Sequence, residues 1–325
     1  MTDRSPRLRR LADELAEIGL PAFADRSLFD LVVEEADHAL RPRVHERRVV
    51  GSGAIVGPTT ESTAWGAGTA LTILRIPVKG QPLEDARRFA DGLSSWLVRR
   101  AGGDHEWLMF DRPAGSERDL VVLADTLGAT LVQRHPSGTV RIVGRFGVLR
   151  TEGFDWHHEP PVEDLAAAVA DPEVASPEIT KALLEFAVHD LGAGGLGAVL
   201  VLRPGGLVGP GGEQRLPSPP ALRVGTPFHL APLRHALGQV DGAAVFDEHG
   251  VLRQLGVRLV PSPWAEREVA PLGGTRHTSA RRYSYDEPQA VVVAVSEDGP
   301  VTVFRRGSLV GRSLPDSEDG QPAAP

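Results

Sequence analysis

Apolar residues recur at helical spacing in three stretches of the N-terminal half. A period near 3.6 residues places such side chains on one side of a helix, where they can pack together. The helices predicted in this way cover residues 5–19, 27–39 and 82–101. In the last of them the shared face carries Ala86, Phe89, Leu93 and Leu97.

Other segments of this half are rich in β-branched residues and predict strands. These segments are residues 47–55, 69–76, 129–133 and 139–143. The last two flank His135-Pro136-Ser137-Gly138, a turn sequence typical of a hairpin. The first half is therefore expected to be a mixed α/β domain, and it shows no catalytic constellation.

A proline-rich segment, Pro160-Pro161 with Pro172 after it, indicates a domain boundary. Beyond it, Ser176 and Pro177 form the start signal of a helix. A second helix is predicted for residues 231–237, and residues 203–224 are expected to form a mobile, Gly- and Pro-rich loop. The predicted strands of this half are residues 198–202, 243–246, 251–259, 290–295 and 301–304.

The fold class expected from this order is α/β with two domains, the second a mixed sheet flanked by helices. A length of 325 residues also favours two domains. We assign residues 1–165 to the first domain, 166–312 to the second and 313–325 to a disordered tail, where Pro, Asp, Ser and Gly dominate.

Composition narrows the function classes. The chain is 41% hydrophobic and 24% charged, and its net charge of −8 argues against a protein that mainly coats nucleic acid. It has no cysteine, and no signal peptide or membrane span is recognisable, so a cytoplasmic location is expected. Only Lys79 and Lys181 are lysines, and no Gly-Lys-Ser/Thr occurs, which excludes a P-loop ATPase.

Three other motifs invite a functional interpretation that their context does not support. Residues 51–57 have the wrong glycine spacing for a dinucleotide-binding loop and run into Pro58. Residues 192–197 have the right spacing but follow a helix and precede a strand, so they read as a helix stop and turn. Adjacent histidines in Trp156-His157-His158-Glu159 could ligate a metal, but a solvated linker is the preferred interpretation.

The candidate site begins at Gly273-Gly274, a glycine pair before a helix predicted to be capped by Thr275. The first N–H groups of such a helix are unpaired and form an anion site that suits phosphate. Arg276 adds a forked cation without an obvious acidic partner in the sequence. Further hydrogen-bonding groups are offered by His277, Thr278 and Ser279.

Asp241, on the turn Asp241-Gly242-Ala243, supplies a carboxylate that could hold a divalent metal or accept a proton. The alternative is that Asp241 only caps a turn, as Asp-Gly often does. His277 has a similar alternative as a structural histidine at a helix start.

Two tyrosines and a pair of acids complete the candidates. Tyr283 and Tyr285 could stack on an adenine or could be plain packing. Glu297 or Asp298 could add to a metal site, or both could belong to a solvated hairpin turn.

Asp-Gly-Ala at residues 241–243, two strands around a Gly turn, and Gly-Thr-Arg-His at residues 274–277 together resemble the diadenylate cyclase (DAC) domain. This is the catalytic module of the DNA-integrity scanning protein and its relatives. Residues 183–188, 197–202 and 291–299 are similar to further parts of that domain, so the resemblance covers roughly residues 170–312. The family usually reads Arg-His-Arg, and Thr278 stands in the third position here.

The resemblance implies that two ATP molecules condense to cyclic di-AMP with release of two pyrophosphates, between two facing domains of a homo-oligomer. Asp241, with Asp298 as a further ligand, would bind Mg²⁺ or Mn²⁺ and act on the attacking hydroxyl. Catalysis would also use Arg276 and His277. The triphosphate would be held by Gly242, Ala243, Gly274, Thr275, Arg276, His277, Thr278 and Ser279.

Two alternatives remain open from the sequence. One is a binding module of the same fold that has lost turnover and senses a nucleotide, because Thr278 replaces an arginine. The other is an unrelated nucleotidyltransferase that uses the same pocket on another acceptor. The N-terminal domain, which shows no chemistry, is expected to have a regulatory, sensor or oligomerising role.

Overall fold

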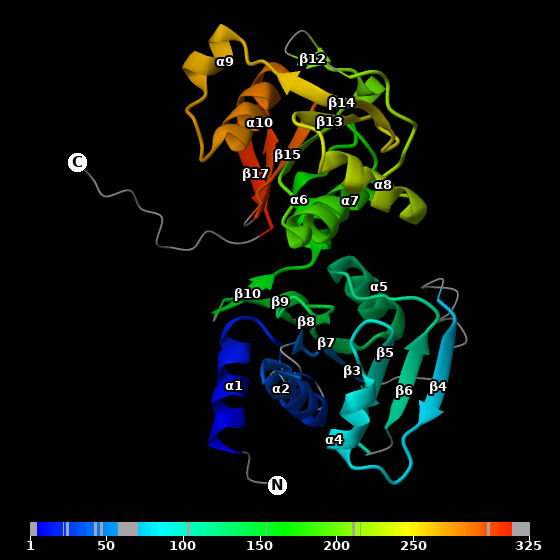
Figure 1. Cartoon of the computed structure of the whole chain (residues 1–325). Coiled ribbons are helices and arrows are strands. Elements are labelled where there is room, and N and C mark those ends of the chain that lie inside the picture. Colours follow the sequence, from blue (N-terminus) through cyan, green and yellow to red (C-terminus); the bar gives the residue numbers. More distant parts are fainter. Residues whose placement is uncertain are drawn as a thin grey trace, which may run out of the picture. The chain divides into compact units, whose positions relative to one another are not determined.

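The computed structural model divides into two compact units, residues 1–161 and residues 162–325 (Figure 1). Each unit contains one large mixed sheet, so the expected α/β class with two domains is confirmed. The structure describes residues 5–21, 23, 26–41, 44–45, 48–57, 71–102, 105–153, 155–209, 212–214, 216–297 and 300–313. The expected tail beyond Ser313 lies outside these residues.

The sheet of the N-terminal unit has eight strands in the order β10-β9-β8-β7-β3-β5-β6-β4. Strands β3 and β5 pair in parallel, and the other neighbours pair antiparallel. The strands are β3 (Ser52–Val56), β4 (Ile73–Pro77), β5 (Ser95–Arg99), β6 (Glu106–Phe110), β7 (Thr130–Arg134), β8 (Val140–Gly144), β9 (Gly147–Glu152) and β10 (Asp155–Glu159). A separate pair consists of β1 (Val44–His45) and β2 (Arg48–Val49). The predicted hairpin is confirmed as β7 and β8.

Helices cover both faces of this sheet. Helices α1 (Pro6–Glu17) and α2 (Arg26–Leu40), both predicted from the sequence, pack with Val132 of β7 on one face. Helix α5 (Glu117–Leu127) packs with the neighbouring Leu131 on the other. Successive side chains of a strand point to opposite faces, so the alternation in β7 separates these two apolar layers.

The predicted helix over residues 82–101 is wrong. Helical structure ends with α4 (Leu83–Ala86) and the short η1 (Arg87–Phe89), and β5 follows. Asp91 Oδ1 accepts hydrogen bonds from the backbone N–H groups of Leu93, Ser94 and Ser95, at 2.7, 2.8 and 2.9 Å. The helix has already ended at Phe89, because Ala90 takes extended backbone angles (φ −113°, ψ 94°), and Gly92 at φ = +73° belongs to the turn that leads into β5. The apolar residues of β5 therefore enter the sheet.

The segment from Trp156 to Glu159 is not a solvated linker, so that interpretation is also wrong. It forms most of β10, which pairs antiparallel with β9 at the edge of the sheet. Glu159 is buried and lies 2.8 Å from Arg150 in an ion pair. His158 Nε2 lies 2.8 Å from the carbonyl oxygen of Phe146. These partners lie on the neighbouring β9 and on the turn before it, so hairpin pairing with β9 brings the segment into the sheet.

The sheet of the C-terminal unit has seven strands in the order β12-β14-β13-β11-β15-β16-β17, with β11 and β13 as a parallel pair. The expected loop at residues 203–224 is wrong in part, because η4 (Pro204–Gly206) and the edge strand β12 lie within it. The strands are β11 (Ala198–Leu202), β12 (Gly212–Gln214), β13 (Ala243–Phe246), β14 (Leu252–Leu259), β15 (Val291–Val295), β16 (Val301–Arg305) and β17 (Ser308–Arg312).

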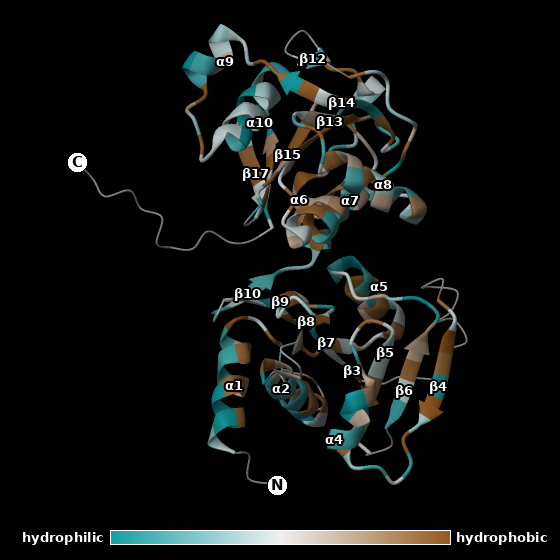
Figure 2. Cartoon of the chain, viewed as in Figure 1, coloured by the Kyte–Doolittle hydropathy of each residue, from teal (hydrophilic) through white to brown (hydrophobic). Residues whose placement is uncertain are grey.

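Two helical layers enclose this second sheet. Leu200 of β11 faces the layer that contains α7, which begins at the predicted Pro177, and Val201 faces α10. In Figure 2 the central strand β15 is apolar, whereas α10 carries a largely hydrophilic surface. The helices are α6 (Val162–Val169), α7 (Pro177–Glu185), η2 (Phe186–Leu191), η3 (Gly192–Gly194), α8 (Pro227–Leu237), α9 (Pro263–Glu268) and α10 (Thr275–Asp286). In the described part of the chain, no helix has the length and apolar character needed to cross a membrane.

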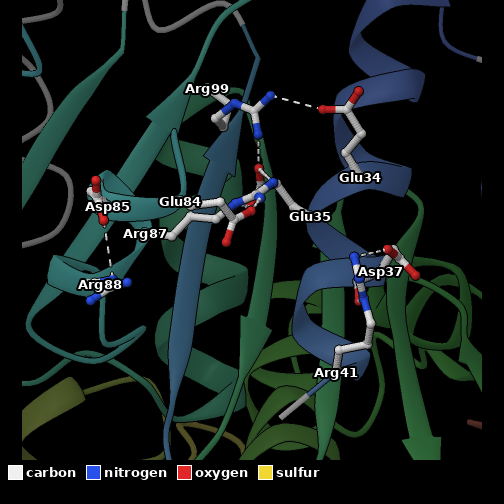
Figure 3. A network of polar contacts seen from close by, with 9 residues as sticks. All are labelled: Glu34, Glu35, Asp37, Arg41, Glu84, Asp85, Arg87, Arg88 and Arg99. Atoms are coloured by element: carbon white, nitrogen blue, oxygen red, sulfur yellow. Dashed lines mark hydrogen bonds and ion pairs between the residues drawn. The ribbon is translucent and has the colours of Figure 1, made fainter. Parts of the chain in front are cut away.

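A buried carboxylate joins α2 to the first sheet (Figure 3). Glu35 is 3% exposed and accepts hydrogen bonds from Arg87, at 2.8 and 3.2 Å, and from the buried Arg99. Arg99 also donates to Glu34 at 3.0 Å. A buried charge is costly unless it is paired, so these contacts hold α2 on the strands.

We expect Glu35→Gln to lower the free energy of unfolding by about 3 kcal/mol, because it leaves the charge of Arg99 poorly compensated. Glu84→Gln is the matched control: Glu84 contacts the same Arg87 at 2.6 Å but is 56% exposed, so its loss should cost less than about 1 kcal/mol. Urea denaturation followed by tryptophan fluorescence measures both. Equal losses would contradict the role given to Glu35.

Candidate functional site

A cavity of about 870 Å³ opens at one edge of the C-terminal sheet. The parallel strands β11 and β13 begin at this edge, and the antiparallel strand β14 ends there. The first turn of α10 completes the wall. The lining residues are Gly195, Leu196, Gly197, Ala198, Val199, Leu237, Gly238, Gln239, Val240, Asp241, Gly242, Ala243, Val257, Arg258, Leu259, Thr275, Arg276, Ser279 and Glu297.

Asp241 lies between α8 and β13 and is exposed on the wall of this cavity. Within the described residues its carboxylate has no hydrogen-bond or ion-pair partner, so it does not cap a turn there. A carboxylate without an internal partner is free to bind a cation or to accept a hydrogen bond from a ligand.

Gly242 fixes where that carboxylate lies. Its φ is +107°, and a Cβ there would come within 2.8 Å of the backbone of Gly256 and Val257. Gly256, at φ = +69°, lies where the register between β13 and β14 shifts. Only a residue without a side chain allows the two backbones to approach so closely. The turn is thus packed against the end of β14.

Helix α10 does not begin as the sequence predicted. Gly274, not Thr275, is the N-cap, and it offers no side-chain cap. The N–H of Thr278 is the first to donate within the helix, to the carbonyl of Gly274 at 3.1 Å. The backbone N–H groups of residues 275–277 precede this first helical hydrogen bond and are therefore available to an anion. Thr275 and Ser279 line the cavity.

Arg276 has an acidic partner that the sequence did not reveal. Its Nη2 donates to Glu297 Oε1 at 3.0 Å, and both side chains are substantially exposed. A Cβ on Gly197 would overlap the guanidinium, so this glycine makes room for the pair. An exposed ion pair contributes little free energy, so a bound phosphate can replace Glu297 as the partner of Arg276.

His277 does not line the cavity. Its Nε2 lies 3.3 Å from Thr302 Oγ1, and its ring meets that of Phe304 edge to face with 6.2 Å between centroids. Burial, followed by the charges of Arg312 and Arg276, lowers the pKa of His277 below its ordinary value. The ring is therefore neutral at pH 7 and packs α10 onto β16.

Thr278 is likewise turned away from the cavity. Its Oγ1 accepts a hydrogen bond from the N–H of Leu272 at 3.2 Å and lies 3.3 Å from the carbonyl oxygen of the same residue. The hydroxyl thereby closes the loop that leads into α10. Gly274 also does not line the cavity, and Asp298 lies outside the described residues.

Neither tyrosine lines the cavity. Tyr283 is fully buried, and burial raises the pKa of its phenol to about 12. Tyr285 accepts a hydrogen bond from Trp264 Nε1 at 2.9 Å. For these two residues, packing is the interpretation that the structure supports.

Arg258 is a cavity residue that sequence reasoning missed. It lies near the end of β14, is exposed, and has no hydrogen-bond or ion-pair partner in the part of the chain that the structure describes. The register shift near Gly256 decides which way the end of β14 faces. A strand pattern alone does not show such a shift, so the sequence carried no signal for Arg258.

The wall of the cavity offers two carboxylates, Asp241 and Glu297, and the second is paired with Arg276. Among the residues described there is no cluster of three acidic or histidine side chains able to hold a metal by itself. Mg²⁺ commonly binds through one or two carboxylates together with substrate phosphates. Asp241 fits that mode of binding.

Two family models match the chain. One, described as "Probable sensor domain DACNK", matches residues 9–159. The other, DAC, described as "DisA bacterial checkpoint controller nucleotide-binding", matches residues 228–309 and so includes both Asp241 and the start of α10. The C-terminal unit thus contains a DAC-family domain, and the N-terminal unit contains a domain of the DACNK type.

The DAC match begins at residue 228, after α7 and β11. Because β11 pairs with β13 inside the matched range and α7 packs in the same apolar core, we call residues 162–325 the DAC unit. No curated protein matches the chain. One solved structure, described as a hypothetical membrane spanning protein from Bacillus cereus, is 20% identical with a TM-score of 0.32. That comparison covers 44% of this chain and 74% of the other.

We expect Gly242→Ala to destabilise the DAC unit by about 1–3 kcal/mol, because a side chain at this φ is strained and meets the backbone of β14. Gly225→Ala is the control, since a Cβ there meets nothing within 4 Å. Chemical denaturation followed by circular dichroism compares the two. If Gly242→Ala were as stable as Gly225→Ala, the close approach would not constrain the turn.

Proposed function

We propose that the DAC unit is a diadenylate cyclase, which condenses two ATP molecules into the second messenger cyclic di-AMP with release of two pyrophosphates. One observation carries the proposal. The unpartnered carboxylate of Asp241 and the cationic start of α10 lie on the walls of one cavity. This is the pairing of charges that a metal-bound triphosphate requires.

The size of the cavity supports a nucleotide as its ligand. About 870 Å³ falls within the range of small-molecule sites, and part of the wall is apolar. The apolar side chains of Leu196, Leu237 and Leu259 would contact the base, and the polar groups of α10 the phosphates. We assign one ATP to each DAC unit, so the reaction needs two units facing one another. A symmetric product fits such a two-fold arrangement.

In each half of the reaction, the 3′-hydroxyl of one ATP attacks the α-phosphorus of the other. An O–P bond forms, the bond from the α-phosphorus to the bridging oxygen breaks, and pyrophosphate leaves with its electron pair. Asp241 would hold the Mg²⁺ or Mn²⁺, which neutralises phosphate charge when it is bound. The 3′-hydroxyl would lie against the carboxylate of Asp241, which orients it and receives its proton.

Thr275, Arg276 and the free amides of α10 would bind the phosphate oxygens, where negative charge increases during the reaction. On this proposal Arg276 releases Glu297 when ATP binds and donates its hydrogen bonds to a phosphate group. His277 acts indirectly, because it packs α10 in place. It is therefore a positioning residue and not a phosphate ligand.

Arg258 would supply the positive charge to the phosphates that an arginine at position 278 supplies in the family motif. The third position of the family's Arg-His-Arg is a threonine here, and its hydroxyl is engaged with Leu272. Arg258 reaches the same cavity from β14 without an internal partner. A guanidinium forms forked hydrogen bonds to phosphate from whichever element presents it.

A second candidate function is a DAC unit that binds a nucleotide without turnover. The hydrogen bonds of Thr278 within the loop favour this function, because the second arginine of the family's Arg-His-Arg motif is absent from α10. In either case we propose a cytoplasmic protein, in keeping with its dependence on ATP and its lack of cysteine. We further propose that the N-terminal unit regulates the DAC unit.

Asp241→Asn should lower the rate of cyclic di-AMP formation at least about 100-fold, because it removes the charge that holds the metal and orients the hydroxyl. Binding of ATP should remain measurable. The assay incubates the full chain with ATP and Mn²⁺ or Mg²⁺ and detects the product by mass spectrometry. ATP binding without any product from the parent would favour the second candidate, and parent-like turnover by Asp241→Asn would refute the role of Asp241.

Arg258→Gln should weaken ATP binding at least about tenfold, since a hydrogen bond to a charged group contributes about 1.5–3 kcal/mol. Arg234→Gln, an exposed arginine of α8 that does not line the cavity, is the matched control. Isothermal titration calorimetry gives the affinities. An unchanged affinity in Arg258→Gln, with a parent that binds ATP, would show that the phosphates are held without Arg258.

A further inference from the structure

A second cavity lies in the N-terminal unit, apart from the residues proposed to act on ATP. It has a volume of about 440 Å³. Its wall is formed by the end of α2, the segment that leads into β3, the α4–η1 turn and the end of β7. The lining residues are His38, Arg41, Val50, Gly51, Ser52, Glu84, Arg87, Arg88, Ala90, Asp91 and Arg134. Four arginines and two carboxylates face it, although the chain as a whole has a net charge of −8.

Two of these arginines contact neighbouring acids, as Figure 3 shows. Arg41, directly after α2, shares Asp37 with Arg7. Arg87 is held between Glu35 and Glu84. These acids offset part of the positive charge on that part of the wall.

Arg134 is different. It is 9% exposed, its Nη1 donates to the carbonyl oxygen of Ala39, and its Nε has no hydrogen-bond partner. Among the described residues no carboxylate pairs with it. Burial lowers the pKa of this guanidinium, which nevertheless remains charged at pH 7. The fold has thus placed a cation out of water without a counter-charge.

The other buried arginines of this unit show how the fold normally treats such a charge. Arg99 is paired with Glu34 and Glu35. Arg141 lies 3.6 Å from a carboxylate oxygen of Glu117. A buried ion is expensive unless it is paired, and Arg134 departs from this pattern at the wall of a cavity.

The two acids of the wall do not compensate for Arg134. Glu84 is bound to Arg87 at 2.6 Å. Asp91 Oδ1 accepts three backbone hydrogen bonds from its own turn. Arg88, also on the wall, is largely exposed and lies 3.4 Å from the similarly exposed Asp85. Arg134 and Arg88 are therefore the charges that a ligand would meet.

We infer that this cavity binds a small anion with a phosphoryl or carboxylate group, whose oxygens complete the coordination of Arg134 and contact Arg88. Guanidinium groups recognise both kinds of oxyanion through paired hydrogen bonds. The volume of about 440 Å³ suits a small metabolite. The match of residues 9–159 to a family described as a probable sensor domain agrees with a ligand site in this unit. The site requires no activity of the DAC unit.

The test uses the full chain with inorganic phosphate and with citrate as separate probes, and with chloride at equal ionic strength as the reference. Isothermal titration calorimetry and the shift in melting temperature report binding. We expect saturable binding of at least one probe that chloride does not reproduce. The probe that binds more tightly distinguishes a phosphoryl from a carboxylate ligand. Absence of saturable binding with both probes would overturn the inference.

Variants locate the binding. Arg134→Gln and the exposed Arg88→Gln should each weaken it at least tenfold, whereas Arg112→Gln, an exposed arginine outside the cavity, should leave it unchanged. Arg88→Gln keeps the test valid if Arg134→Gln does not fold. Arg258→Gln separates this site from the DAC cavity. Binding that is lost only in Arg258→Gln, or that persists in both Arg134→Gln and Arg88→Gln, would assign the anion elsewhere and refute the proposal.

Discussion

The contact between Gly242 and the backbone of Gly256 and Val257 is the constraint on which the DAC cavity depends. It draws the entrance of β13 against the end of β14, so that Asp241 and Arg258 reach the same space from different strands. Because Gly242 carries no Cβ, the two backbones can pack at a place where a side chain would overlap Gly256 and Val257. The placement of a negative and a positive group on one wall therefore follows from backbone geometry and not from a direct bond between the two side chains.

Helix α10 divides its first residues between two tasks. Thr275, Arg276 and Ser279 face the cavity, while His277 and Thr278 hold the helix to β16 and to the preceding loop. Consecutive helical residues point about 100° apart, so a short motif necessarily serves both the ligand side and the protein side. This explains why a threonine can stand at the third position of the motif. On the protein side a hydroxyl closes the loop, and a cation can come from β14.

The N-terminal unit is organised around buried charge. Glu35 ties α2 to η1 and β5 through Arg87 and Arg99, and Glu117 lies beside Arg141 and Arg150 on the other side of the sheet. Such pairs hold helices and strands in specific positions, because a buried charge left without its partner would destabilise the fold. Within this framework Arg134 is the buried cation whose counter-charge the described residues do not provide. The two units thus present cavities of different chemistry, one with a free carboxylate and one dominated by arginine.

Sequence pattern alone determined the α/β class, the helices α1, α2 and α7, the hairpin of β7 and β8, and the buried strands β11 and β15, because local periodicity and turn residues encode these elements. It also selected Asp241 and the start of α10. It failed at residues 82–101, where an aspartate-centred turn overrides the helical spacing, and at residues 156–159, where pairing with β9 makes a strand of the expected linker. Only the tertiary structure decided that Arg258 joins the cavity, that His277 and Thr278 leave it, and that Glu297 pairs with Arg276. For Arg276 and His277 the deciding contacts join residues more than twenty positions apart, and for Thr278 the contact depends on the path of the loop from Leu272; no local pattern specifies either.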